Sequence, residues 1–464
     1  MTWIDTLINY IPEVGGPSQR RLSFKEKLKW TGIVLVLFFI LGLVPLFGLG
    51  QNALQQFKFL SIILGAEFGS IISLGIGPIV TSSIVLQLLN GSGLVKFDLT
   101  THEGKRRFQG IQKLLTLFFI VFEACIYVFL GGLAPDGAFA GTARFVQLEL
   151  LLVLQLIIGG VLIVFMDEIV SKWGFGSGIS LFIAAGVSKQ IFITALSPIA
   201  SITNPAYMTG AVPAMIQALL RQEHLSFLLQ FGKVAATIIV FCVAVYVQAM
   251  KVEIPLSFGR VRGHGIRWPL SFTYANVLPV ILVSALLANI QLWARLLQNW
   301  GHPLLGTFSS QGAPITGVVS WVNPPNIFEK LIKSSLSFGD FGIALFYMAI
   351  MIGGCVIFSI FWVQTSGMDA KSQARQMMAS GLQIPGFRRD PRIMERLLER
   401  YIGPLTVMGG ATIGFLSALA DLSGSLVQGT SLMLTVMIIY RLYEEIAKQH
   451  MYDMHPMMRK FMEV

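Results

Sequence analysis

Few residues in the sequence have the types and the spacing that catalysis requires. His102 and Glu103 lack the second histidine of a His-Glu-x-x-His zinc-protease motif, and they lie in a charged stretch between apolar runs. The run Gly176, Ser177 and Gly178 is not the Gly-x-Ser-x-Gly turn of a serine hydrolase. We find no metal-ligand cluster and no phosphate-binding loop. The sequence therefore predicts no catalysis, no metal, no cofactor and no nucleotide-driven pumping, so any driving force must come from outside the chain.

Ionisable and polar residues inside apolar runs are the other candidates for chemistry. Glu123 stands near the middle of one run, where a carboxylate facing lipid would be costly, so we expect it to face the protein interior. Thr81 and Asn289 lie in two other runs, but such residues often only hold helices together by hydrogen bonds. Lys189, late in the run at 179–196, can extend to the membrane surface.

The apolar runs that contain these residues have the length of membrane spans. Of the 464 residues, 54% are hydrophobic and 12% are charged, and the mean hydropathy is +0.70. Soluble domains carry roughly 25% charged residues, and a soluble fold could not bury this much apolar surface. Runs of about 20 residues, which cross ~30 Å of hydrocarbon, recur along the chain. We predict ten spans, at 30–48, 71–89, 114–133, 146–165, 179–196, 234–250, 275–296, 341–363, 404–419 and 427–446.

The distribution of basic residues predicts the orientation of these spans. Clusters of Lys and Arg precede the first span and follow the second, sixth and eighth, whereas the intervening loops carry single basic residues such as Lys58 and Arg144. Because Lys and Arg are enriched in cytoplasmic loops, we predict that both termini are cytoplasmic. The same rule accounts for the net charge of +10 without a nucleic-acid partner.

The spans divide into two sets of five. A proline-containing external segment, 197–233, separates an N-terminal half, 30–196, from a C-terminal half, 234–446. Because five is odd, the two halves must enter the membrane from opposite sides, which is the topology of an inverted repeat. The odd number of spans in each half is the only support for an inverted repeat, since we see no clear residue-level similarity between the halves. Residues 1–29 are predicted to be an amphipathic cytoplasmic segment, and residues 447–464 a cytoplasmic tail.

The region before the second span is broken by glycine and proline. A short, moderately apolar segment at 52–64 is followed by several glycines and Pro78 before the apolar run resumes. One interpretation is a re-entrant half-helix inside a funnel, because irregular backbone at membrane depth must be satisfied by protein or by a cavity. The other is an ordinary external loop followed by a kinked span. The sequence alone does not choose between them.

Two pairs of β-branched residues stand four positions apart on one helix face. They are Ile76 with Val80, and Ile179 with Ile183. Such pairs usually face lipid or core. They can also line a hydrophobic constriction that gates a pore by dewetting.

The loops 251–273 and 365–401 are long, basic and punctuated by Gly and Pro. Topology alone explains some of their charge but not their length. A partner rich in phosphate or acidic groups would explain both.

Several motifs together resemble one family. They are KLKWTGIVLV at 27–36, LGIGPIVT at 74–81, DEIVSKWGFGSGISLFIAAG at 167–186, ANIQLW at 288–293 and IPGFR at 384–388. These stretches resemble SecY, the large subunit of the protein-translocation channel, and its archaeal branch most closely. The resemblance runs from about residue 24 to residue 457.

The resemblance implies an all-α polytopic membrane protein, with ten transmembrane helices in two inverted five-helix halves around a central hourglass pore. It implies a plug at about 52–64 that blocks the external funnel, and a lateral gate between the second and seventh spans, beside the third and eighth. By resemblance, the pore ring is Ile76, Val80, Ile179, Ile183, Ile281 and Leu434; the polar cluster of the gate is Thr81, Glu123 and Asn289; and the plug includes Asn52, Phe57, Leu60, Ile63 and Leu64.

The resemblance also implies partners. They are a SecE-type single-span subunit, a second small Sec subunit, the ribosome, signal-peptide-bearing or nascent chains, and the lipid of a cell membrane, or of the endoplasmic reticulum in a eukaryote. Contact with ribosomal RNA is expected through the basic loops. The residues expected to bind the ribosome or another cytosolic partner are Arg260, Arg262, Lys371, Arg375, Arg388 and Arg389.

Two other classes of protein are weighed against a passive protein-conducting channel. A secondary active transporter also has inverted repeats and broken helices, but it should bring polar residues together at the midplane, where this chain offers Ile and Val. A membrane-embedded hydrolase would need the catalytic sets that the sequence lacks.

Overall fold

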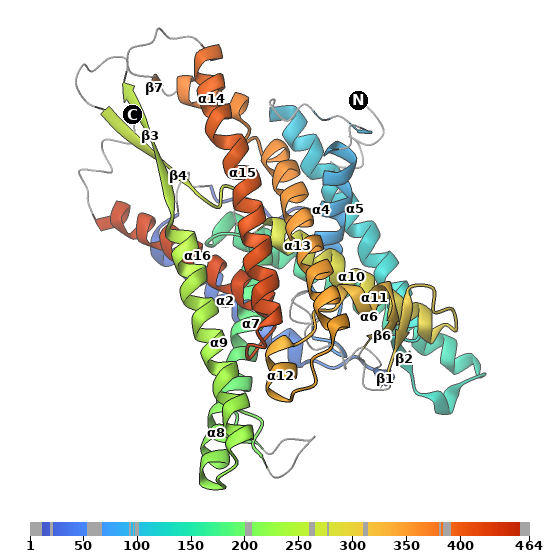
Figure 1. The fold of residues 1–464 in the computed structure, drawn as a ribbon. Helices are drawn as coiled ribbons and strands as arrows, with labels where there is room; N and C mark the ends of the chain where they lie inside the picture. Colours follow the sequence, from blue (N-terminus) through green and yellow to red (C-terminus); the bar gives the residue numbers. More distant parts are fainter. Residues whose placement is uncertain are drawn as a thin grey trace.

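The computed structural model describes residues 12–18, 22–52, 67–91, 94–95, 97, 102–199, 207–258, 265–275, 278–309, 314–379, 382–383 and 391–454. The described residues form a bundle of long helices with small sheets at its ends (Figure 1). The helices are α2 (Phe24–Leu43), α4 (Gly77–Gly91), α5 (His102–Phe129), α6 (Ala143–Trp173), α7 (Gly178–Leu196), α8 (Ala211–Leu220), α9 (His224–Ala249), α10 (Leu278–Asn299), α11 (Val318–Val322), α12 (Ile327–Ile332), α13 (Phe338–Thr365), α14 (Ala370–Ala379), α15 (Pro391–Leu422) and α16 (Gly429–Met454).

The strands are short and form three antiparallel sheets among the described residues. β1 (Leu49–Asn52) pairs with β2 (Leu133–Pro135), and β5 (Gly306–Phe308) pairs with β6 (Pro314–Gly317). β3 (Lys251–Phe258) forms a hairpin with β4 (Gly265–Ser271), and β7 (Leu382–Gln383) adds to the other edge of β3. The hairpin and α14 stand at one end of the bundle, and α8 and α12 at the other (Figure 1).

Each of the ten predicted spans falls on one helix: α2, α4, α5, α6, α7, α9, α10, α13, α15 or α16. Seven helices in the described part of the chain are long and apolar enough to cross a membrane, and α4 is a shorter apolar helix. Many large apolar side chains on these helices are exposed, among them Phe231, Ile239 and Tyr246 on α9. Exposed apolar surface on this scale suits contact with lipid. The fold is therefore that of an α-helical polytopic membrane protein, while the count of ten spans stays a prediction.

Two regions differ from the sequence prediction. α9 begins at His224, before the predicted span at 234–250, and α8 lies inside the segment predicted to be an external loop. Polar residues interrupt the first turns of α9, so hydropathy alone placed its start too late. The basic segment 251–273 is mostly a hairpin, in which Lys251 and Glu253 are exposed and Ile254 is buried, an alternation typical of a strand.

Buried apolar side chains form two clusters among the described residues. The larger lies between the long helices, and the smaller joins the β3–β4 hairpin to α14 and α15. The hairpin from one basic loop therefore packs on helices of the other, so the two basic loops share one structural unit. The smaller cluster includes Ile254, Leu270, Ala374, Met377, Leu398 and Ile402.

Candidate functional site

The chain enters α4 through irregular backbone that the protein itself satisfies. Gly69 and Gly75 have φ of +96° and +56°, which glycine adopts without strain. The amide of Leu46 donates to the carbonyl of Gly69 at 2.9 Å, and the hydroxyl of Ser73 donates to the carbonyl of Ser70 at 2.5 Å. Leu74 is fully buried. Between 67 and 77 the backbone is therefore irregular, buried and satisfied by the protein, while residues 53–66, on which the predicted half-helix falls, lie outside the described part.

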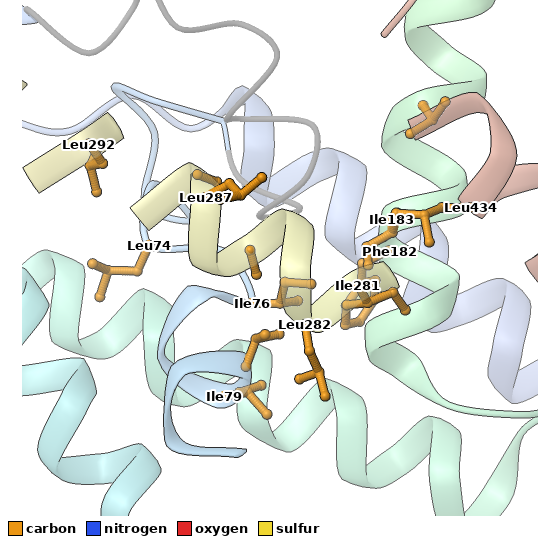
Figure 2. Close-up of a cluster of buried hydrophobic side chains, with 14 of the residues drawn as sticks. Leu74, Ile76, Ile79, Phe182, Ile183, Ile281, Leu282, Leu287, Leu292 and Leu434 are labelled. Atoms are coloured by element: carbon orange, nitrogen blue, oxygen red, sulfur yellow. The ribbon is translucent and has the colours of Figure 1, made fainter. Parts of the chain in front are cut away.

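The six residues predicted to form the ring come from distant segments and join one apolar cluster. Ile76 precedes α4, Val80 lies on α4, Ile179 and Ile183 lie on α7, and the other two lie on α10 and α16. Figure 2 shows Ile76, Ile183, Ile281 and Leu434 among the side chains of this cluster. Five of the six are at most 3% exposed, and Ile179 packs at the edge. Four segments far apart in the sequence therefore contribute aliphatic side chains to the same buried cluster.

A cavity with a mixed polar and apolar lining adjoins the aliphatic cluster. It has a volume of about 740 Å³ and is lined by residues of α4, α5, α7, α10, α13 and α16. Ile179 lies in its wall, so the cavity ends near the aliphatic cluster. Its polar lining includes Gln87, Gln109, Gln112, Ser180, Arg441 and Glu445.

Thr81, Glu123 and Asn289 meet in a buried chain of hydrogen bonds. The side-chain amide of Asn289 donates to Thr81 Oγ1 at 3.1 Å, and Thr81 Oγ1 donates to Glu123 Oε1 at 3.1 Å. The chain links α10 to α4 and α4 to α5. The second carboxylate oxygen of Glu123 has no hydrogen-bond partner among the described residues. The expectation that Glu123 faces inward agrees with its exposed fraction of 2%.

The helices around this polar cluster pack as a four-helix group. α4 packs against α5, α10 and α13, and α13 also packs against α10. Ser82 on α4 and Thr116 on α5 share a further buried hydrogen bond of 2.7 Å. Among the described residues, two side-chain hydrogen bonds join α4 to α5, and the bond from Asn289 to Thr81 joins α4 to α10.

Of the residues predicted to bind a cytosolic partner or to form the plug, the structure describes the side chains of Lys371 and Arg375 only. Both are exposed on α14, whose Ala374 and Met377 pack into the smaller core. Asn52 is the last residue of β1, and its side chain lies outside the described set. The other unplaced residues, which lie outside the described ranges, are Phe57, Leu60, Ile63, Leu64, Arg260, Arg262, Arg388 and Arg389.

Polar contacts that the sequence did not predict, buried at Asp421 and part-buried at Asp167, lie towards the ends of α15 and α6. Asp421 accepts hydrogen bonds from Tyr347 and Thr430, and Asp167 accepts one from the amide of Ile179. Both aspartates stand beside or within apolar runs, which was the available signal. Lys189, expected to extend to the membrane surface, is exposed and pairs with Glu67 at 2.5 Å. No group of three or more His, Cys, Asp or Glu suited to a metal is present in the part of the chain that the structure describes.

Comparison with known proteins identifies the family. Residues 70–443 match the SecY family model, and residues 36–69 match the model for the plug domain of Sec61p. The chain is 46% identical over 462 residues to the protein translocase subunit SecY of Methanothermobacter thermautotrophicus, covering 99% of this chain and 98% of that relative. The chain belongs to the SecY family. The SecY of Pyrococcus furiosus is 41% identical over 98% of both chains.

Solved structures support the same SecY assignment. "The structure of a protein conducting channel" is 40% identical, with a TM-score of 0.83 over 97% of this chain and 98% of that chain. "Sec61 in the Canine ribosome-channel complex from the endoplasmic reticulum" is 39% identical, with a TM-score of 0.79 over the same shares. The resemblance to SecY and to its archaeal branch is thereby confirmed. A SecY-family chain is a translocase subunit and not an enzyme, which agrees with the missing catalytic motifs.

Proposed function

We propose that this chain is the pore-forming subunit of a protein-conducting channel, which passes secretory proteins across the membrane and releases membrane segments sideways into lipid. One observation carries the proposal: four segments far apart in the sequence place buried aliphatic side chains in one cluster, and a large, partly polar cavity adjoins that cluster at Ile179. A secondary transporter would place polar groups in this cluster. Here the residues are isoleucine, valine and leucine.

The ring, defined by Ile76, Val80, Ile179, Ile183, Ile281 and Leu434, suits the passage of a polypeptide. Aliphatic side chains offer no hydrogen-bond partner to an ion, to water or to a passing backbone. An ion entering the ring would lose hydration without compensation, so leakage is restricted. A polypeptide would slide without being held. The partly polar cavity beside Ile179 is the vestibule through which a chain reaches the ring.

The lateral gate is the seam between α4 and α10, with Thr81, Glu123 and Asn289 as its polar cluster. Opening this seam breaks the bond from Asn289 to Thr81, and a typical hydrogen bond contributes about 1 kcal/mol net. Burial of apolar side chains contributes about 0.8 kcal/mol per methylene. An apolar signal segment of an incoming chain can therefore offset the loss, and a polar segment cannot. The gate thus responds to the hydrophobicity of the segment presented to it.

The plug is proposed at about 52–64, and the family model for the plug domain, which matches residues 36–69, supports that position. Glu67, which follows the proposed plug in the sequence, pairs with Lys189 on α7 and so ties this end of the segment to the N-terminal half.

The topology proposed is ten spans in two inverted halves around an hourglass pore, with both termini cytoplasmic. Residues 1–29 and 447–464 are the cytoplasmic ends, 197–233 is the external segment, and 251–273 and 365–401 are the cytoplasmic loops. The exposed Lys371 and Arg375, on a unit with its own core, support docking of an acidic or phosphate-rich partner there.

The partners proposed are a SecE-type single-span subunit, a second small Sec subunit, the ribosome with its RNA, and chains bearing a signal peptide. A SecY relative, Sec61, is described in a ribosome-channel complex, which supports the ribosome. Arg260, Arg262, Arg388 and Arg389 are proposed to take part with Lys371 and Arg375.

Photo-crosslinking tests the proposed path. A photoreactive residue at Ile183 should crosslink a stalled secretory chain in ribosome-bound channels reconstituted with the small subunits. Ile193 is a matched control, because it lies on the same helix with 42% of its surface exposed. Crosslinking at Ile193 but not at Ile183 would place the path outside the ring and refute the proposal.

A further inference from the structure

The two halves contain matching sequences at the helices that carry the ring. Pro78 is the second residue of α4 and Pro279 is the second residue of α10, and in each helix a ring residue follows two positions later, Val80 and Ile281. Proline at this place costs no helical hydrogen bond and presets the backbone for the helix. The second and seventh spans thus begin in the same way.

The fifth and tenth spans match more closely. α7 begins with Gly178, Ile, Ser, Leu, Phe and Ile183, and α16 begins with Gly429, Thr, Ser, Leu, Met and Leu434. Glycine, serine and leucine recur at the same three positions. A ring residue stands five positions after the glycine in both. This similarity between the halves was not recognised in the sequence, because the matching segments are short and the helices around them differ.

In the N-terminal half, Asp167 joins the end of one helix to the start of the next. It lies near the end of α6, and its Oδ1 accepts a hydrogen bond from the amide of Ile179 at 3.0 Å. A side chain at Gly178 would come within 2.6 Å of the Cα of Asp167, so glycine is needed for the close approach. The start of α7 is therefore pressed against α6 at this aspartate.

In the C-terminal half, Asp421 occupies the corresponding place. It lies at the end of α15, and its Oδ1 accepts a hydrogen bond from the amide of Thr430 at 2.8 Å. Its Oδ2 accepts from the hydroxyl of Thr430 and, at 2.6 Å, from the hydroxyl of Tyr347 on α13. A side chain at Gly429 would come within 2.0 Å of the backbone of Ala420. The contact between carboxylate and helix start is the same as in the first half.

We propose that Asp167 and Asp421 are symmetry-related positioning residues, each holding the ring helix of its half at the depth and rotation that bring Ile183 or Leu434 into the ring. The inference rests on the proposed ring. Five residues of α-helix rise about 7.5 Å, so each helix starts about 7.5 Å along its axis from its ring residue. Because the halves are inverted, the two helices start on opposite sides of the ring. Each carboxylate also faces the positive end of a helix dipole, which strengthens the hold.

The experiment uses the assembled channel complex in liposomes without a translocating chain. Asp421→Ala and Asp167→Ala are compared with Asp340→Ala, a matched control. Asp340 is a buried aspartate that caps the start of α13, through Ser337, on a helix that carries no ring residue. Two quantities are measured: the efflux of a small trapped dye, and the crosslinking of Ile183→Cys to Leu434→Cys by a short bismaleimide with the native cysteines replaced by alanine.

If the two aspartates position the ring helices, Asp167→Ala and Asp421→Ala should raise dye efflux roughly tenfold and change the crosslinking yield. Loss of a hydrogen bond to a charged group shifts the equilibrium between a sealed and a displaced ring helix by about that factor. Asp421→Asn keeps an acceptor oxygen and should restore most of the seal. Asp340→Ala should lower thermal stability alone. Equal efflux in all three alanine variants, or none above wild type, would overturn the proposal.

Poor assembly of Asp421→Ala does not prevent the test. Thr430→Ala removes only the hydroxyl that donates to Asp421 and should raise efflux by a smaller factor. The two proposals can fail separately. If a photoreactive residue at Ile183 still crosslinks a translocating chain, but these variants keep a normal seal and a normal bismaleimide crosslink between positions 183 and 434, the proposed function stands and this inference alone fails.

Discussion

Asn289→Ala should lower the hydrophobicity that a signal segment needs to open the lateral gate. The substitution removes the hydrogen bond of 3.1 Å from Asn289 to Thr81, which joins α10 to α4 across 208 residues of sequence. The bond from Thr81 to Glu123 is left in place. The substitution destabilises only the closed state, because the open state lacks this bond in both the wild-type channel and the variant.

The magnitude follows from the single bond lost. A net contribution of about 1 kcal/mol per hydrogen bond changes the ratio of open to closed channels about fivefold. Burial of one methylene contributes about 0.8 kcal/mol. The variant should therefore open for signal segments that contain about one methylene fewer than the wild-type channel requires. The measurement is the insertion yield of a reporter series whose signal segments differ by single methylenes, and the expected result is a shift of the midpoint by about one step.

Asn299→Ala is the matched control, because Asn299 is the exposed last residue of the same helix. It should leave the midpoint unchanged. Thr81→Val removes both bonds at Thr81, so the double variant with Asn289→Ala should shift the midpoint no further than Thr81→Val alone. An unchanged midpoint in Asn289→Ala, or full additivity in the double variant, would refute a gate held by this bond.

Three further predictions concern the ring, the basic loops and the N-terminal segment. Ile281→Ser should raise the ion conductance of the resting channel in planar bilayers, while Ile193→Ser on the lipid side should not; equal conductance would exclude a hydrophobic seal. Arg388→Glu should weaken ribosome binding in sedimentation assays, most strongly at low salt, and binding unchanged at every salt concentration would contradict a docking role. The bond from Lys172 holds the pKa of Glu13 below its ordinary value of 4.5, so this contact stabilises the segment above that pH and is lost as the pH falls through the lowered pKa. Cleavage of the segment by pepsin should therefore rise as the pH falls below about 4.5, and Lys172→Ala should abolish that dependence; a dependence that persists in the variant would assign it to other groups.

Hydropathy predicted the membrane class and the approximate place of every long helix. It failed at the start of α9, where polar side chains interrupt the first turns, and at the β3–β4 hairpin, where basic residues concealed an alternation of buried and exposed side chains. The inward orientation of Glu123 was predictable, because lipid penalises an exposed carboxylate wherever its partner lies. That partner, Thr81, was proposed only through the family resemblance.

The sequence by itself determined that the chain is a membrane protein, because the hydrocarbon layer acts on each segment of about 20 residues independently of the others. Family membership was also readable from extended motifs. Only the tertiary structure decided that Ile76, Ile183, Ile281 and Leu434 share one buried cluster, and that Asp167 and Asp421 hold corresponding helix starts. Contacts of this kind depend on how separate helices pack in depth and rotation. That packing is a property of the assembled helices, and the apolar pattern of any one segment does not contain it.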